Sequence, residues 1–307
     1  MYDIVIIGAG PAGMTAALYA RRAEKSVLLI EKNSFGGQIT HSPRVENYPG
    51  FMAMSGNEFA EKLLEQVTAH GTDIEFDEVT EVKPFDNGGF TVTGASGAEF
   101  FAKSVIIATG SKHRSLGIAR EEEFVGEGVS YCAVCDGAFY KGKTVAIIGG
   151  GNTALQEAVL LSDGCKKVFV VQNLDFLTGE GALQIAVSKR ENVEVILSSV
   201  VTEILGESEI SGIKIRNDKT GEETTLSLDG IFVAIGQKPE NEPFENVVGL
   251  DSYGYIVSGE DCLPTTEYKG IFVAGDCRTK AIRQVTTAAA DGAVAALSAC
   301  RYIDSQK

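Results

Sequence analysis

Residues 3–13 read DIVIIGAGPAG, an apolar run that passes directly into a glycine-rich segment. The run at 3–7 is short and rich in β-branched residues, as is a second run at 27–30, and such runs are typical of parallel strands buried on both faces. The stretch between them, 11–23, has the apolar spacing of a helix. The sequence therefore predicts a strand, a helix and a second parallel strand at the start of the chain.

The glycines of this segment predict a dinucleotide site. Gly8, Gly10 and Gly13 stand where a tight turn, a close approach of backbone to a pyrophosphate and close helix packing require them. The helix N-terminus adds positive potential, which favours phosphate. Glu31 ends the second strand, where a carboxylate can accept hydrogen bonds from ribose hydroxyls. The alternative is a glycine turn that binds no ligand.

The same plan recurs later in the chain. Apolar runs at 144–148 and 167–171 flank a second glycine-rich segment, GGGNTA at 149–154. Each half later reaches a similar apolar strand, at 105–110 in the first and 231–236 in the second. The predicted fold class is α/β, with two Rossmann-like (three-layer ββα) dinucleotide-binding-type domains.

Two segments with alternating hydrophobicity, 74–101 and 200–228, predict a small antiparallel layer beside each sheet. Turn signals within them are Asn87-Gly88-Gly89 and Thr220-Gly221.

The C-terminal part is assigned back to the first domain. A last strand at 271–274 runs into Gly275-Asp276 and is followed by a helix at about 283–302. A glycine and a carboxylate after a strand suit a turn that binds hydroxyl or anionic groups. The second domain is therefore expected to be inserted in the first, which gives a discontinuous first domain at 1–113 and 242–307 and an insertion at 114–241.

Composition excludes several classes of protein. The chain has 307 residues and a net charge of -15, which argues against nucleic acid as a partner. We expect no membrane span and no leader segment, hence a cytoplasmic location. Six cysteines are too few for a disulfide scaffold. Four of them are expected to be buried apolar side chains: Cys165, Cys262, Cys277 and Cys300.

Cys132-Ala133-Val134-Cys135-Asp136 is the predicted chemical centre. Two intervening residues allow the sulfurs to bond across one helical turn, and a helix N-terminus lowers a thiol pKa. Zinc is the competing reading, but a closed site needs two further ligands, and the sequence has no second cysteine pair and three scattered histidines; we expect no metal. Asp136 can relay a proton if burial raises its pKa, or it can simply cap the helix.

Over essentially its full length the chain resembles the low-molecular-weight thioredoxin reductases. Besides the motifs above, the resemblance is carried by Gly36-Gly37-Gln38, Val45-Glu46-Asn47-Tyr48-Pro49-Gly50, Ala108-Thr109-Gly110, Gly275-Asp276 and Arg283-Gln284-Val285. It implies bound FAD, a homodimer, and thioredoxin as partner. It further implies that the discontinuous domain at 1–113 and 242–307 is the FAD-binding domain and that 114–241 is a CxxC-bearing insertion similar to the family's NADPH domain. It also implies that Cys135 exchanges electrons with the flavin, that Cys132 attacks the disulfide of the partner and that Asp136 manages the proton. The implied FAD-binding residues are Gly8, Gly10, Pro11, Ala12, Gly13, Glu31, Lys32, Gly37, Gln38, Asn47, Val79, Thr109, Gly110, Gly275, Asp276, Arg283, Gln284 and Val285.

The second glycine loop departs from that family. NADPH-dependent members carry His-Arg-Arg and a further Arg where this chain has Gln172, Asn173, Leu174 and Leu177, and no Lys or Arg lies between Lys167 and Lys189. A 2′-phosphate needs such cations, so NADPH is expected to bind poorly. Asp175 is the remaining candidate for a ribose diol.

This departure resembles the ferredoxin-dependent flavin thioredoxin reductases, which implies ferredoxin as electron donor. A ferredoxin at roughly -400 mV lies below a thioredoxin at roughly -270 mV. Docking needs a local basic patch, because both proteins are acidic. The alternatives are an NAD(P)H-dependent thioredoxin reductase, a flavin dithiol oxidase that uses oxygen, and a flavin-bound interaction module without catalysis.

Overall fold

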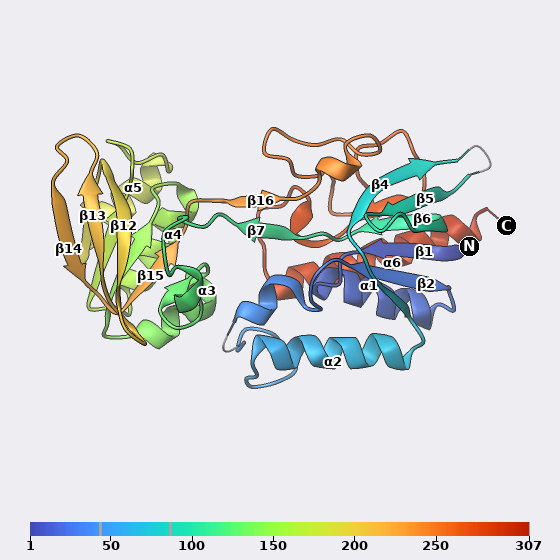
Figure 1. The fold of residues 1–307 in the computed structure, drawn as a ribbon, viewed down its shortest axis with the longest axis horizontal. Coiled ribbons are helices and arrows are strands. Elements are labelled where there is room, and N and C mark those ends of the chain that lie inside the picture. Colours follow the sequence, from blue (N-terminus) through green and yellow to red (C-terminus); the bar gives the residue numbers. More distant parts are fainter. Residues whose placement is uncertain (43–44, 86–87, 307) are drawn as a thin grey trace. The chain divides into compact units, whose positions relative to one another are not determined.

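A computed structural model describes residues 1–42, 45–85 and 88–306, and the chain forms two compact units (Figure 1). Unit 1 comprises Met1–His41, Tyr48–Lys112 and Lys238–Lys307, and unit 2 comprises Ser42–Asn47 and His113–Gln237. Asn87 of the predicted turn lies outside the described residues.

Unit 1 is built on a seven-stranded sheet in the order β3-β2-β1-β6-β5-β4, with β17 also paired to β6. The pairs of β1 with β2 and β6, of β2 with β3 and of β6 with β17 are parallel, whereas β4, β5 and β6 pair antiparallel. The strands are β1 (Tyr2–Ile7), β2 (Val27–Glu31), β3 (Asp73–Phe76), β4 (Val79–Pro84), β5 (Phe90–Gly94), β6 (Glu99–Ile107) and β17 (Ile271–Val273).

Three helices accompany this sheet: α1 (Pro11–Arg22), α2 (Gly56–Ala69) and α6 (Val285–Asp304). Alanines on α6 share one buried cluster with alanines of α1 and the inward side chains of β1 and β2. The two helices approach closely, because a Cβ on Gly292 would collide with the carbonyl oxygen of Ala12. The C-terminal helix is therefore part of the core of unit 1.

Unit 2 repeats the parallel arrangement in a five-stranded sheet, β11-β10-β9-β15-β8, beside a three-stranded antiparallel sheet, β12-β13-β14. The elements are β8 (Val129–Ser130), α3 (Ala133–Asp136), β9 (Thr144–Ile148), α4 (Asn152–Ser162), β10 (Lys167–Val171), α5 (Gly181–Ser188), β11 (Val193–Ile196), β12 (Ser199–Gly206), β13 (Ile210–Asn217), β14 (Glu223–Ser227) and β15 (Gly230–Val233). The predicted α/β class with two Rossmann-like units is confirmed.

The two chain segments that connect the units pair with each other as short strands, β7 (Ser111–His113) and β16 (Gln237–Pro239). The strands expected at 105–110 and 231–236 end earlier, at Ile107 and Val233. Gly110 and Gly236, the last residues of the expected strands, have φ angles of +70° and +101°, which lie outside the extended region of a regular strand.

The four cysteines outside the CxxC segment are all buried, as predicted. Among residues 1–42, 45–85 and 88–306, no helix combines the length and the hydrophobicity needed to cross a bilayer.

Candidate active site

The three glycines of the first glycine loop have different surroundings. Gly8 has a φ of +102°, and a Cβ there would collide with the carbonyl oxygen of Ala108. A Cβ on Gly13 would likewise collide with the carbonyl oxygen of Gly8. Gly10 differs, since a Cβ would meet nothing nearer than the Gly36 oxygen at 3.9 Å. Gly8 and Gly13 are thus needed by the fold, while Gly10 keeps a space open at the start of α1.

Glu31 and its neighbour Lys32 have different roles. Glu31 holds the loop, because its Oε2 accepts a hydrogen bond from the Ala9 amide at 2.7 Å. The ammonium of Lys32 lies 3.1 Å from a Glu78 oxygen and 2.8 Å from a Glu240 oxygen. Lys32 is therefore engaged in ion pairs in this structure.

Asp276 is a buried carboxylate with an unused oxygen. It lies in the short 3-10 turn η5 (Gly275–Cys277), and its Oδ1 has no hydrogen-bond partner among the described residues. Burial raises the pKa of Asp276, although Lys280 and Arg283 oppose this effect. Nε of Arg283 is also buried and unpartnered in the described part of the chain. A ligand with hydroxyl groups and negative charge fits both groups.

The turn at Gly275 is held by a buried ion network. Asp291 of α6 accepts hydrogen bonds from the Gly275 amide at 3.0 Å and from Arg278, at 3.0 Å for both Nε and Nη2. Lys280 donates to the same carboxylate at 2.9 Å. This network fixes the position of Asp276 without using its side chain.

The remaining predicted FAD residues are distributed around the loop and beyond it. Gly37 is close, since a Cβ there would lie 3.6 Å from the Cα of Gly10. Thr109 donates a hydrogen bond to Asn241 at 3.0 Å. Asn47 is exposed and groups with unit 2. The others begin helices or strands or lie beside them: Pro11 and Ala12 begin α1, Gln38 lies in η1 (Gly37–His41), Val79 begins β4, Gly110 precedes β7, and Gln284 and Val285 begin α6.

Cys132 and Cys135 are joined by a disulfide bond at the start of α3. Their Cα atoms are 5.3 Å apart. The Cys135 amide donates to the sulfur of Cys132 at 3.2 Å, so an N–H of the helix start is directed at that sulfur. Both residues are half-buried. The pair can therefore cycle between disulfide and dithiol at a site that a partner can reach.

Asp136 is linked to the dithiol through Ser130. The Ser130 hydroxyl donates to Oδ2 of Asp136 at 2.6 Å and accepts a hydrogen bond from the Cys132 amide at 3.1 Å. Burial raises the pKa of Asp136, and the Ser130 hydrogen bond opposes this only in part. Its Oδ1 is buried with no partner among the described residues. A carboxyl group in this setting can hold and release a proton beside the sulfurs.

Sequence reasoning missed Glu157, which lies against the same turn. Its Oε1 accepts a hydrogen bond from the Ala133 amide at 3.2 Å. The signal was present in the sequence, since Glu157 is the one charged residue of the otherwise apolar and neutral helix α4.

The second glycine loop has similar backbone but different surroundings. Gly149 has a φ of +131°, and a Cβ there would collide with the carbonyl oxygen of Ala234. Gln172 is 5% exposed and packs onto Gly150. The carbonyl of Gly150 accepts hydrogen bonds from the amides of Thr178 and Gly179, both at 2.9 Å. The segment after β10 therefore folds back onto the glycine loop.

The surroundings of that segment include one cation from elsewhere in the chain. Asp175 forms an ion pair with Lys219 at 2.7 Å. Asp175 is thus already engaged, and Lys219 is a residue that reasoning along the loop alone could not find.

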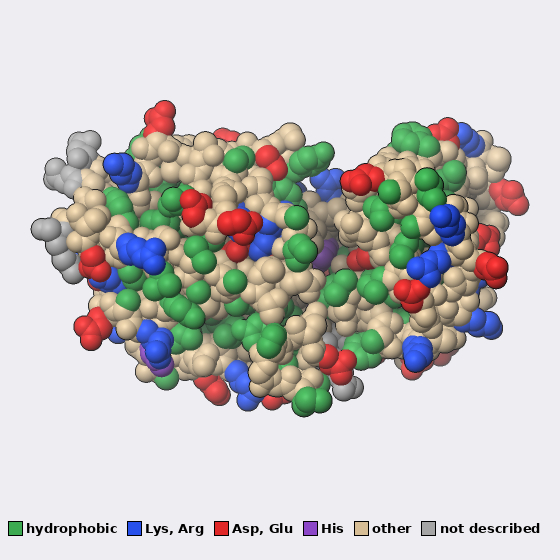
Figure 2. All heavy atoms as spheres, turned by 180° about the vertical axis from the view of Figure 1, so that it is seen from behind, with side chains coloured by type: hydrophobic (Ala, Val, Ile, Leu, Met, Phe, Trp, Pro, Cys, Tyr) green, Lys and Arg blue, Asp and Glu red, His purple; other side chains and the backbone are tan. Residues whose placement is uncertain are grey.

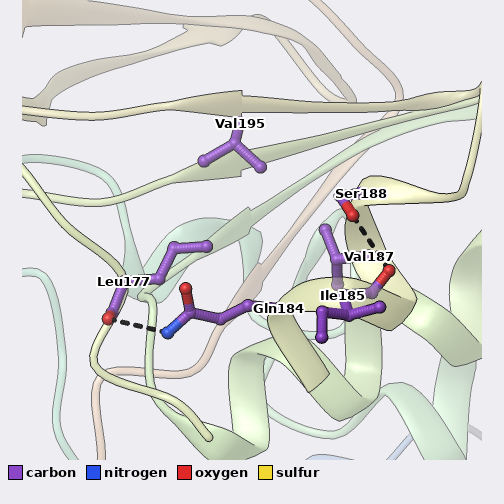
Figure 3. Close-up of a pocket in the computed structure, with 6 residues that line it drawn as sticks. All are labelled: Leu177, Gln184, Ile185, Val187, Ser188 and Val195. Carbon is purple, nitrogen blue, oxygen red and sulfur yellow. Dashed lines mark hydrogen bonds between the residues drawn. The ribbon is translucent and has the colours of Figure 1, made fainter. Parts of the chain in front are cut away.

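An apolar pocket of about 350 Å³ lies beside the same segment, between α5 and β11 (Figure 3). Its lining residues are Leu177, Gln184, Ile185, Val187, Ser188 and Val195. The amide of Gln184 points to the Leu177 carbonyl, 3.2 Å away, and the Ser188 hydroxyl to the Ile185 carbonyl, 2.9 Å away (Figure 3). None of these lining residues carries a charge, so the pocket offers no charged partner to a phosphate.

Two Rossmann-like units, one of which carries a CxxC disulfide, define a disulfide oxidoreductase of the nucleotide-binding type. The family of pyridine nucleotide-disulphide oxidoreductases matches residues 2–292. A thioredoxin reductase of Listeria monocytogenes is 41% identical over 308 aligned positions, covering 100% of this chain and 95% of that protein. A Clostridium pasteurianum protein, described as a 34.2 kDa protein in the rubredoxin operon, is 42% identical over 98% of this chain and 97% of its own length.

Comparison with solved structures leads to the same family. The thioredoxin reductase of Streptococcus pyogenes superposes with a TM-score of 0.93 at 40% identity, over 99% of each chain. The chain belongs to the low-molecular-weight thioredoxin reductase family of flavoprotein disulfide oxidoreductases. Its cofactor is FAD.

Proposed function

We propose that this enzyme reduces the disulfide of a thioredoxin with electrons that pass from FAD through Cys132 and Cys135, and that a reduced ferredoxin supplies those electrons. The observation that carries the choice of donor is the segment after β10, which has no Lys or Arg between Lys167 and Lys189 and borders an uncharged pocket. Thioredoxin as the partner is supported by the names of the relatives.

Unit 1 is the proposed FAD-binding domain, with unit 2 as the insertion that bears the dithiol. The proposal is supported by the open space at Gly10 at the start of α1, by the Glu31 carboxylate at the end of β2, and by the unused carboxylate oxygen of Asp276. The other residues expected from the family resemblance complete the site. When bound, FAD supplies two-electron redox chemistry and can accept those two electrons singly.

Three residues of unit 2 have separate proposed roles in the reduction of thioredoxin. Cys132 is the proposed nucleophile, whose thiolate attacks the thioredoxin disulfide and forms a mixed disulfide. Cys135 then attacks the Cys132 sulfur, which releases reduced thioredoxin and restores the Cys132–Cys135 disulfide. Asp136 holds the proton that the departing thiolate needs, because its pKa is raised and Ser130 orients it.

Ferredoxin docking requires local basic groups, since the chain carries a net charge of -15. On the face drawn in Figure 2, Lys and Arg side chains are interspersed with Asp and Glu over both units. A ferredoxin that docks on this face would meet cations that stand among acidic side chains, which suits a transient complex whose rate falls as salt rises. We further propose a homodimer in the cytoplasm, in keeping with the family resemblance.

Anaerobic stopped-flow mixing of the oxidised holoenzyme with each donor tests the proposal. We expect bleaching of the flavin absorbance by reduced ferredoxin within the turnover time, and slow or no bleaching by NADPH or NADH. Rapid bleaching by NADPH with none by ferredoxin would exclude the ferredoxin proposal. Oxygen uptake with a small dithiol would instead favour a dithiol oxidase.

One observation favours an NAD(P)H-dependent reductase as the second candidate. Lys219 is held beside the segment after β10 by Asp175, and a lysine can serve as a point-charge partner of phosphate. Two pieces of evidence weigh against it: Lys219 is already neutralised by that carboxylate, and it stands alone where the family's basic motif has several cations.

A further inference from the structure

Glu157 is a buried carboxylate that the proposed chemistry leaves unused. It lies on α4 and is 9% exposed. One oxygen accepts the Ala133 amide, which belongs to the residue directly after Cys132, at 3.2 Å. The other oxygen, Oε2, is buried with no partner among the described residues. A single hydrogen bond offsets little of the free energy that burial of an ionised carboxylate costs. That hydrogen bond joins Glu157 to the turn that carries the disulfide.

Among the described residues, no cation forms an ion pair with Glu157. Of the elements packed against α4, β9 and α5 contain no ionisable residue. α3 and its N-cap residue Cys132 bring the two sulfurs and Asp136, and the adjoining 3-10 turn brings Tyr140. β10 brings Lys167, whose ammonium lies 2.6 Å from Glu194. Burial raises the pKa of Glu157 to about 7, and the Ala133 hydrogen bond opposes this. Glu157 therefore changes charge around neutral pH.

We propose that Glu157 is a positioning residue whose charge sets the reduction potential of the Cys132–Cys135 couple and makes that potential depend on pH. Reduction breaks the sulfur–sulfur bond with two electrons. It yields two thiols after uptake of two protons, or one thiol and one thiolate after uptake of one. A negative carboxylate bonded to the amide next to Cys132 disfavours the thiolate. Ionised Glu157 thus makes the dithiol the stronger reductant, and protonation of Glu157 weakens that effect.

This inference rests on the disulfide chemistry of the family and not on the identity of the electron donor. Chemical redox buffers can therefore test it, and its failure and the failure of the ferredoxin proposal are separate results.

The test compares wild-type holoenzyme with Glu157→Gln, which keeps an acceptor for the Ala133 amide and similar volume but removes the charge. Each protein is equilibrated with dithiothreitol redox buffers between pH 5.5 and 9, then alkylated, and reduced Cys132 and Cys135 are counted by mass spectrometry. At pH 8.5 we expect the variant's equilibrium constant for reduction to be about tenfold larger, a potential about 30 mV higher. At pH 5.5 the two potentials should coincide, because Glu157 is then protonated.

Glu203→Gln is the matched control, since it removes an exposed carboxylate of the same unit that pairs with Lys214. It should follow the wild type at every pH. Equal potentials for wild type and Glu157→Gln across the range, or an equal shift in the control, would overturn the proposal.

A second measurement keeps the proposal testable if Glu157→Gln does not fold. Reduction of the wild-type holoenzyme at pH 7 should raise the pKa of Glu157, so the infrared difference spectrum should gain a protonated-carboxyl band. That band should persist in Asp136→Asn, which removes the other carboxyl group near the sulfurs. Its absence from Asp136→Asn, whether or not the wild type shows it, would overturn the proposal.

Discussion

The two glycine loops have nearly the same backbone and different neighbours. In each, the first glycine has a positive φ, +102° at Gly8 and +131° at Gly149. Each of these glycines lies against the carbonyl of the alanine that directly follows a parallel strand, β6 in unit 1 and β15 in unit 2. β2 ends in a carboxylate, Glu31, whereas β10 is directly followed by an amide, Gln172. A glycine loop is thus required by the fold itself, and ligand preference depends on the residues that follow the second strand.

Gly10→Ala and Gly151→Ala are the sharpest test of that difference. Neither glycine has a positive φ, and the nearest atoms to an added Cβ are 3.9 Å away at Gly10 and 3.7 Å away at Gly151, so both variants should fold. At Gly10 the methyl group occupies the space proposed for the pyrophosphate, and we expect FAD to bind about 100-fold more weakly, roughly 2.7 kcal/mol. Flavin content after purification and titration with FAD measure this.

Gly151→Ala should leave both FAD content and ferredoxin-driven turnover unchanged, because no dinucleotide is proposed to bind at the second loop. A large loss of ferredoxin-driven turnover in this variant, with FAD still bound, would mean that the second loop takes part in turnover after all.

Exchanging Glu31, at the end of β2, and Gln172, directly after β10, should change FAD affinity less than Gly10→Ala does. Glu31→Gln keeps one acceptor for the Ala9 amide and removes the charge that ribose hydroxyls would meet. We expect an FAD dissociation constant about tenfold higher, within the range of a hydrogen bond to a charged group. The reciprocal variant Gln172→Glu should leave FAD affinity unchanged. Equal affinities for Glu31→Gln and wild type would remove Glu31 from the proposed ribose contact.

Adding cations to the segment after β10 should give the enzyme a preference for NADPH over NADH that the wild type lacks. Asn173 and Leu174 are both exposed, so Asn173→Arg with Leu174→Arg costs little stability. The rate of flavin reduction by NADPH relative to NADH should rise about fivefold, because guanidinium groups can then pair with the 2′-phosphate. Asn173→Gln with Leu174→Gln is the neutral control. An unchanged ratio would show that missing cations are not what limits NADPH use.

The sequence predicted the parts of both units that depend on local pattern. Apolar β-branched runs and glycine spacing located β1, α1, β9 and α4, because burial on both faces of a sheet imposes that composition. Contacts between distant segments could not be predicted. Lys219 pairs with Asp175 across a separation of 44 residues, and Glu157 reaches Ala133 across 24. Only tertiary packing brings such groups together, and the residue types alone did not indicate a partner.

Asp276 gives the smallest expected effect and concerns only unit 1. Its pKa is raised in the folded protein, so folding without FAD is favoured when the carboxyl is protonated and loses that advantage as pH rises above the unfolded value of 3.8. Asp276→Asn removes the buried charge. At pH 8 we expect the FAD-free variant to melt a few degrees higher than the FAD-free wild type, and the difference should shrink towards pH 4.

With FAD bound the order should reverse at pH 8, because the variant loses the carboxylate acceptor proposed for the cofactor. Thermal unfolding followed by circular dichroism, with and without FAD, measures both. A higher melting temperature for the variant in both states would mean that Asp276 holds no part of FAD.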